Sequence, residues 1–270
     1  NIEPEPGSEI IFAPPIPSKT ALKNGSELII IEKKDLPIAQ IGLFTNKGAT
    51  SDPSTSPGLT KFLANMMVEG TNKRSGEEIA SELEFLGTRL SKEISREHSF
   101  FSVDCLSKNI NQSLDILADV IANPIFPDED LNRLRKEQIS DLTAQNDNPD
   151  FLASTMYRGI LYGHNSSHGH PISGTIDAVN DYSISTIQDQ YKDVVLNSNH
   201  TFIAVGDFDK NDIIKQINRL FVSSSNTMLE NQRGNPNHLS EITHRPTEIY
   251  IVDRPGAAQS VIRAGHITLD

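Results

Sequence analysis

The sequence predicts an α+β domain, in which a largely antiparallel sheet carries helices packed on it. Segments with the two-residue periodicity of strands and segments with helical periodicity alternate irregularly along the chain. The early strand-like segments lie close enough in the sequence to pair as hairpins. Their order differs from the regular strand–helix–strand repeat that is typical of a doubly wound parallel sheet.

Strands open the predicted domain. The run LIIIEKK (28–34) follows a turn signal at 22–26, and IAQIGLFT (38–45) follows a Leu-Pro break. Both runs are rich in β-branched and aromatic residues, so we expect them to pair with each other. An apolar pattern at helical spacing follows within residues 58–71.

Capping residues mark the later helices. Ser75 and Glu78 have the spacing of a capping box at the start of EEIASELEFL, and Gly87 is placed to end that helix. Asn148 and Pro149 fit the cap and first-turn positions of another helix. The remaining elements are expected as strands at 88–94, 98–106 and 201–206 and helices at 111–122, 128–146, 150–162, 183–193 and 210–221, with a loop at 163–175.

Composition narrows the classes of function. The net charge of −12, from 24 Lys and Arg against 36 Asp and Glu, argues against a nucleic-acid partner. The chain has no apolar run long enough to span a membrane. A single cysteine, Cys105, excludes an internal disulfide and leaves the compartment open. It lies in the alternating run FFSVDCL, so we interpret it as a small core residue rather than a nucleophile.

Changes in composition suggest how the chain is divided. Residues 1–19 are rich in proline and polar groups and are expected to form a loosely held N-terminal arm. The predicted helices and strands fill residues 20–221. Residues 222–247 are rich in Ser, Asn and Pro and indicate an interdomain linker, which leaves residues 248–270 for a further unit.

The helix within GLTKFLANMMVEGT (58–71) is the most informative segment. Lys61, Ala64 and Asn65 share one of its faces. An ammonium, a methyl and an amide are not zinc ligands, since zinc binds thiolate, neutral imidazole or carboxylate. From the residues alone, this is an amphipathic core helix, whose buried stripe consists of Leu59, Phe62, Leu63, Met66 and Met67.

The segment nevertheless resembles the zinc helix of the pitrilysin/insulinase family of metallopeptidases, whose inverted motif is His-x-x-Glu-His. Lys61 stands in place of the first His, Ala64 in place of the Glu and Asn65 in place of the second His. The family's third ligand is a Glu on a later helix, and the resemblance places Asp141, within LRKEQISDL, at that position. The likeness continues in the same order over residues 20–266.

The resemblance implies a fold and a division of the chain. The family's fold is of the α+β type, so residues 20–221 are expected to be a peptidase-like domain that lacks the zinc motif. Residues 248–270 resemble the opening of the family's second, homologous domain, which is incomplete here. We expect no metal site and no catalytic residue in this chain, and an ion pair between Lys61 and Asp141 in place of the metal.

A second feature of the family is the strand that follows Gly87. In active members its exposed edge receives the substrate backbone as an added strand. Here the run is GTRLSKEIS, so Ser91, Lys92 and Glu93 are the candidate substrate-binding residues. An ordinary strand is the alternative interpretation.

Three histidines in GHNSSHGHP form a competing candidate metal site. Imidazoles at the spacing of His164, His168 and His170 could bind zinc or nickel. The run aligns with a connection that has no ligand role in the family that the chain resembles. We therefore interpret the three residues as plain loop residues.

The resemblance leads to one functional hypothesis and leaves two alternatives. The chain is expected to be the non-zinc subunit of a two-chain zinc peptidase, where it helps to enclose and position peptide substrate. Its partner is a homologous subunit that carries the zinc motif, and zinc is expected only there. By analogy the protein is expected to be periplasmic or otherwise exported, and a cytoplasmic location is the alternative. The alternatives are a binding or scaffold protein with the same fold, and an active metallopeptidase with an unconventional site.

Overall fold

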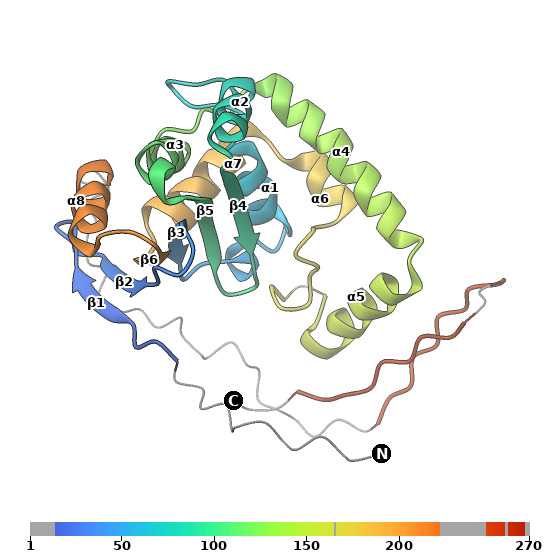
Figure 1. Cartoon of the computed structure of the whole chain (residues 1–270). Helices are drawn as coiled ribbons and strands as arrows, with labels where there is room; N and C mark the ends of the chain where they lie inside the picture. The colour runs from blue at the N-terminus through green and yellow to red at the C-terminus, as the bar shows by residue number, and fades with distance from the viewer. Residues whose placement is uncertain (1–13, 165, 222–246, 257–258, 268–270) are drawn as a thin grey trace, which may run out of the picture.

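A six-stranded sheet forms the centre of the protein in the computed structural model, which describes residues 14–164, 166–221, 247–256 and 259–267 (Figure 1). The strands lie in the order β1-β2-β6-β3-β5-β4. Four of the five strand pairs are antiparallel, and β2 with β6 is parallel. This confirms the predicted α+β class. The strands are β1 (Ser18–Ala21), β2 (Glu27–Glu32), β3 (Ile38–Thr45), β4 (Arg89–Ile94), β5 (Ser99–Leu106) and β6 (His200–Gly206).

Eight α-helices occur in the described residues. They are α1 (Leu59–Met66), α2 (Gly76–Leu86), α3 (Ile110–Ala122), α4 (Asp128–Asn146), α5 (Pro149–Tyr162), α6 (Ile176–Asp181), α7 (Ile184–Tyr191) and α8 (Lys210–Leu220). Short 3₁₀ turns lie at Ala49–Ser51 and Ser107–Asn109, and a π-helical turn at Lys192–Leu196 extends α7. The long helix α4 runs along one side of the domain, and α5 turns back from its end (Figure 1).

The pairing expected between the first two strand runs is wrong. Residues 28–34 and 38–45 correspond to β2 and β3, but β6 lies between them. Ala204 of β6 is opposite Ile30 on one side and Ile41 on the other. The turn at 22–26 instead joins β1 to β2. With a neighbour on each side, β6 is a central strand, and its Phe202 and Ala204 side chains are buried.

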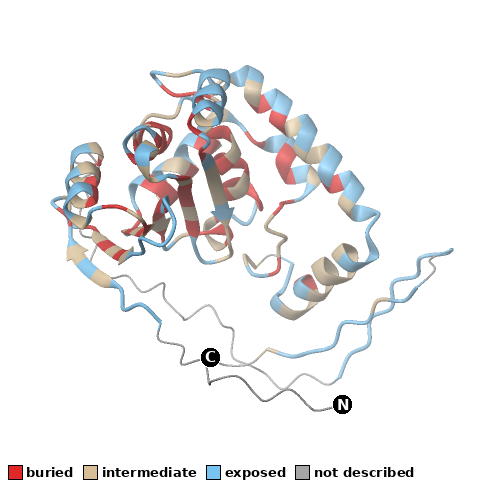
Figure 2. Ribbon diagram, viewed as in Figure 1, coloured by how far each residue is buried: buried red, intermediate tan, exposed pale blue. Residues whose placement is uncertain are grey.

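One face of the sheet lies in the core. Buried side chains alternate along the strands, and α1, α3 and α7 contribute to the same apolar cluster (Figure 2). The opposite face is only half-buried over much of its area. Cys105 lies in the buried set, as expected of a core residue, and burial raises the pKa of its thiol. The buried sheet residues include Leu28, Ile30, Ile41, Leu43, Phe101, Val103, Phe202 and Ala204.

The predicted helix boundaries depend on caps, and the structure confirms these. Ser75 accepts a hydrogen bond from the backbone of Glu78, whose side chain accepts one from Ser75 in return. Gly87 ends α2 in the left-handed conformation, with φ of 59°. Asn148 caps α5, and Pro149 is its first residue.

The ends of the chain bear on the division into domains. Strand β1 begins at Ser18, inside the expected arm of residues 1–19, and the rest of that arm up to residue 13 lies outside the described residues. Residues 222–246 of the expected linker also lie outside them. The described parts of 248–270 contain no helix or strand, so a second domain that begins there stays a prediction. In the part of the chain that the structure describes, no helix is long and apolar enough to cross a membrane.

Candidate functional site

Helix α1 is placed by its apolar stripe. The five residues of that stripe are each at most 1% exposed, as the sequence predicts. On another face of the helix, Lys61 and Asn65 are half-buried, and Ala64 between them is buried. The side chains at the three motif positions therefore share one partly open surface of the domain.

A buried carboxylate anchors the start of α1. Asp52 accepts hydrogen bonds from the backbone N–H groups of Gly58 at 2.7 Å and of Thr60 at 2.8 Å, and from the Thr60 hydroxyl at 2.6 Å. Gln190 of α7 donates to the Thr60 hydroxyl at 2.8 Å. Asp52 thus satisfies donors at the helix N-terminus that have no partner within the helix. Burial raises the pKa of Asp52 to about 6, although these hydrogen bonds act in the opposite direction.

Close backbone packing brings the 163–175 loop against the same helix. Gly58 has φ of 91°, and a Cβ atom there would lie 2.4 Å from the Cα of Gly174. Tyr182 donates a hydrogen bond to the Pro57 carbonyl at 2.6 Å. Gln138 of α4 donates to the Ser173 carbonyl at 2.8 Å and holds the other side of the loop. The loop therefore forms a fixed wall beside α1.

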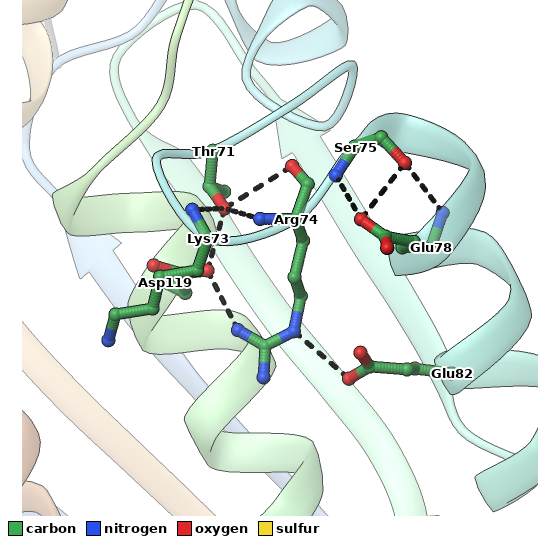
Figure 3. A network of polar contacts seen from close by, with 7 residues as sticks. All are labelled: Thr71, Lys73, Arg74, Ser75, Glu78, Glu82 and Asp119. Atoms are coloured by element: carbon green, nitrogen blue, oxygen red, sulfur yellow. Dashed lines mark hydrogen bonds and ion pairs between the residues drawn. The ribbon is translucent and has the colours of Figure 1, made fainter.

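The turn between α1 and α2 is fixed by a charged network (Figure 3). The Arg74 guanidinium donates to Asp119 of α3 at 2.7 Å and to Glu82 of α2 at 3.0 Å. Thr71 also donates to Asp119, at 2.7 Å. Burial alone would raise the pKa of Asp119, but hydrogen bonds from Thr71, Asn123 and Arg74 lower it below its usual range. This network ties α2 and α3 to the segment that leaves α1.

A small cavity of about 210 Å³ lies beside the three motif positions. Helix α1, the edge strand β4 and the 163–175 loop each contribute to its wall. Its lining residues are Lys61, Ala64, Asn65, Lys92, Ile94 and Ile172. The structure thus brings the three positions that the resemblance aligns with the zinc motif together with one of the candidate substrate-binding residues, Lys92.

The charge around the cavity is positive. Burial lowers the pKa of Lys92, and the nearby carboxylate of Glu69 opposes that shift. Glu69 itself forms an ion pair with Arg133 of α4. Within the described part of the chain, neither Lys61 nor Lys92 has an ion pair or a side-chain hydrogen bond. Two ammonium groups therefore face the cavity with no carboxylate bound to either.

These residues do not fit a zinc ion. The α1 face offers an ammonium, a methyl and an amide, and β4 adds a second ammonium, so the cavity holds no zinc donor and repels a dication. In the described residues, no group of three or more His, Cys, Asp or Glu side chains could hold a metal. Asp141 is exposed and outside the cavity wall.

The expected ion pair between Lys61 and Asp141 is wrong. The salt bridges of the described residues do not include one between these two side chains. Along α4, Gln138 and Leu142 point towards the loop and the core, whereas Asp141 is exposed to solvent. The helical rotation of one residue is sufficient to turn the carboxylate away from α1.

Strand β4 is an edge strand, as the sequence predicts, because it pairs only with β5 in the described structure. Lys92 is opposite Phe101 of β5, which is buried, so its side chain lies on the core side of the sheet and reaches the cavity. Ser91 and Glu93 alternate with it and point to the other face. The binding of substrate by these three residues stays a prediction.

The three loop histidines do not converge. The His168 imidazole is 3.0 Å from a Glu97 carboxylate oxygen, and the His170 imidazole contacts the His164 backbone carbonyl. His164 packs on α5, where a Cβ atom at Gly159 would lie 2.4 Å from its ring. The arrangement agrees with the interpretation of the three as loop residues.

Sequence reasoning missed two residues of the cavity wall, Ile94 and Ile172. Ile94 is at the end of a predicted strand, where nothing distinguishes it from other apolar strand residues. Ile172 reaches α1 only because the loop packs against Gly58, which is a contact between segments far apart in the sequence. No local pattern could have identified either residue.

Comparison with known proteins shows which family has this sequence pattern. The family model for insulinase (peptidase family M16) matches residues 28–166, which include α1, β4 and α4. The chain belongs to the insulinase family. An uncharacterised zinc protease of Rickettsia felis is 27% identical over 207 residues, which are 75% of this chain and 49% of that protein. A probable mitochondrial-processing peptidase subunit beta of Arabidopsis thaliana is 25% identical over 220 residues, 80% of this chain and 40% of that protein.

Solved structures of the insulinase family share this fold. The peptidase M16 inactive domain from Pseudomonas fluorescens superposes with a TM-score of 0.70 at 20% identity, over 77% of this chain and 50% of that one. The periplasmic protease PqqL from Escherichia coli has a TM-score of 0.70 at 19% identity, over 78% of this chain and 24% of that one. The chain spans about half the length of the Rickettsia relative and less of the Arabidopsis one.

Proposed function

We propose that this chain is a non-catalytic insulinase-family subunit that works with a homologous, zinc-bearing subunit in a two-chain peptidase. The observation that supports the proposal is that α1 is packed and anchored like a zinc helix but has no zinc ligands. Its apolar stripe, its Asp52 anchor and its neighbouring loop form a complete scaffold, while the three motif positions carry Lys61, Ala64 and Asn65. The chain therefore has the helix that positions a metal in this type of fold, without side chains that could bind the metal.

Hydrolysis is assigned to the partner subunit. A zinc peptidase needs a metal that lowers the pKa of a bound water and a carboxylate that takes the proton. Here the position of that carboxylate is occupied by Ala64, whose methyl group cannot accept a proton. Zinc and the hydrolytic step therefore belong to the partner, and this chain supplies substrate contacts and part of the enclosing wall.

The substrate contacts come from β4. Its outer edge has no strand partner among the described residues, so its backbone N–H and C=O groups can pair with an extended peptide that adds as a further strand. Backbone pairing does not depend on side-chain identity, so it survives the loss of the zinc motif. Enclosure between two subunits would exclude water and hold the peptide from both sides.

The comparisons support a divided enzyme. One relative is described as the beta subunit of a processing peptidase, and one structural neighbour is described as an inactive domain of this peptidase family. We also propose that the protein is exported to the periplasm, because another structural neighbour is described as a periplasmic protease.

A native pull-down tests the proposal. The chain is tagged in its own organism and recovered under mild conditions, and the bound proteins are identified by mass spectrometry. We expect an insulinase-family chain with an intact His-x-x-Glu-His motif in roughly equal amount. Recovery of an assembly that contains no such chain would contradict the proposal and favour a scaffold role.

A further inference from the structure

We propose that the cavity beside α1 is a carboxylate-binding site that receives an acidic group of a peptide lying along β4. The proposal extends the proposed function, because it assumes that peptide substrate pairs with the β4 edge. It assigns a substrate class, acidic peptides, to the surface that the resemblance aligns with the metal site of active family members.

Three side chains with N–H donors converge on this cavity. Lys61 and Asn65 are one turn apart on α1, and Lys92 reaches the cavity from β4. In the part of the chain that the structure describes, none of the three side chains has a hydrogen bond or an ion pair. The cavity therefore offers two ammonium groups and one amide to an incoming acceptor.

The protein's own acids do not neutralise this charge. Glu69 is near enough to Lys92 to influence its pKa, but it forms its ion pair with Arg133. Arg133 is bound in turn by Asp130 and Glu137, at 3.1 Å and 3.0 Å. Asp141 faces solvent. An anion that enters the cavity would thus meet positive charge without competition from a bound carboxylate.

The size and wall of the cavity select the kind of anion. A volume of about 210 Å³ accommodates one side chain or one chain terminus, and is below the range of about 300–1,000 Å³ that holds most small-molecule ligands. Ala64, Ile94 and Ile172 provide apolar surface for the methylene groups of such a side chain. A carboxylate can accept hydrogen bonds on both oxygens, and charge-assisted bonds of this kind are among the strongest in proteins.

The position of Lys92 connects the cavity to the peptide. In a peptide paired with β4, the residue opposite Lys92 would point to the same side of the sheet. That side chain would lie over the cavity if it were Asp or Glu. A peptide that ended there and turned out of the strand would instead bring its terminal carboxylate to the cavity.

Fluorescence anisotropy with labelled peptides tests the proposal on the full chain. Three matched peptides are needed: one with a central Glu, one with Gln at that position, and one with neutral side chains and a free rather than amidated C-terminus. We expect at least one acidic peptide to bind roughly tenfold more tightly than its neutral match. The peptide that binds more tightly shows whether the bound carboxylate belongs to a side chain or to the C-terminus.

Variants test whether the preference for acidic peptides depends on the lysines of the cavity. The double variant Lys61→Met/Lys92→Met should lose most of the tenfold difference, whereas Lys215→Met should keep it. Lys215 is an exposed lysine on α8, a helix beside β1 and β2 at the other edge of the sheet from β4, and serves as the matched control (Figure 1). Equal binding of acidic and neutral peptides would overturn the carboxylate site but leave the β4 proposal intact.

A second measurement examines the cavity without a long peptide. Acetyl-glutamate is titrated into ¹⁵N-labelled chain, and the side-chain amide signal of Asn65 is followed by NMR. We expect acetyl-glutamate to shift this signal and acetyl-glutaminamide, which has no carboxylate, to leave it unchanged. A shift with acetyl-glutamate, together with no binding of the labelled peptides in the anisotropy measurement, would support the carboxylate site and contradict the β4 role. The absence of a shift would contradict the carboxylate site.

Discussion

Lys61 and Asn65 are the residues on which the functional assignment depends. They lie one helical turn apart on α1, at the two positions that the resemblance aligns with the imidazoles of a zinc helix. Both side chains are half-buried and face a cavity that β4 also lines. The scaffold that would orient two ligands is therefore present, and the difference from a metal helix lies in the side chains themselves.

Restoring the imidazoles tests this view. The variant Lys61→His/Asn65→His should bind Zn²⁺ at least roughly tenfold more tightly than the unmodified chain, because two histidines at i and i+4 chelate zinc from one helix face. Isothermal titration calorimetry measures the gain, and Lys61→His alone is the control. Equal zinc affinity in the double variant and the unmodified chain would show that the face is not arranged for ligation.

Asp52 gives a pH prediction at the same scale. Its pKa is about 6 in the folded protein and 3.8 in the unfolded chain, so between these values the folded state alone holds the proton. Stability should therefore fall as the pH rises from about 4 to about 6, by about 3 kcal/mol from this residue. Above that range the cost of the buried charge is constant.

Urea unfolding across this pH range measures the effect. The difference in unfolding free energy between the unmodified chain and Asp52→Asn should change between pH 4 and pH 6 and level off above it. Asp141→Asn, which removes an exposed carboxylate with no partner among the described residues, is the control and should change stability by less than about 0.5 kcal/mol. A constant difference for Asp52→Asn would refute the shift.

At the scale of elements, the turn between α1 and α2 couples the site to the body of the domain. Arg74 and Thr71 both donate to Asp119, whose side chain is only 2% exposed. The same guanidinium donates to Glu82, which is far more exposed. These contacts join α2 and α3 at the end of the segment that follows the motif helix.

Replacement of Asp119 should therefore be costly. Asp119→Asn removes the buried one of the two carboxylates bound to Arg74, and we expect a loss of about 2–4 kcal/mol in unfolding free energy. Glu82→Gln removes the other carboxylate bound to Arg74 and should cost less than about 1 kcal/mol, because that pair is exposed. Denaturant unfolding compares the two, and equal losses would mean that the buried contact has no special role.

Across the whole molecule, local signals in the sequence predicted more than long-range ones. The capping box at Ser75, the glycine at Gly87 and the cap at Asn148 set their helices correctly, because each acts within a few residues. The element β1 was not identified, since four residues give little periodicity, and neither was the short α6. The insertion of β6 between β2 and β3 depends on a strand far along the chain.

For the candidate site, too, features set within one segment were predicted and features set by tertiary contacts were not. The face shared by Lys61, Ala64 and Asn65 follows from helical spacing, and the edge position of β4 agrees with the family pattern. The exposure of Asp141 did not follow from the sequence, because neighbouring residues of a helix point about 100° apart and the packing of α4 decides which of them faces α1. Lys92 of β4 lies in the same cavity as the α1 residues because of tertiary packing, which neither the α1 segment nor the β4 segment predicts by itself.

The most direct test of the central claim compares the purified chain with the assembly it forms in its own organism. Zinc content is measured by mass spectrometry, and hydrolysis of a quenched fluorescent peptide is followed with and without a chelator. The chain alone should retain no stoichiometric zinc and cleave nothing, whereas the assembly should contain zinc and lose activity with the chelator. One zinc ion bound per chain, with chelator-sensitive cleavage by the chain alone, would contradict the account.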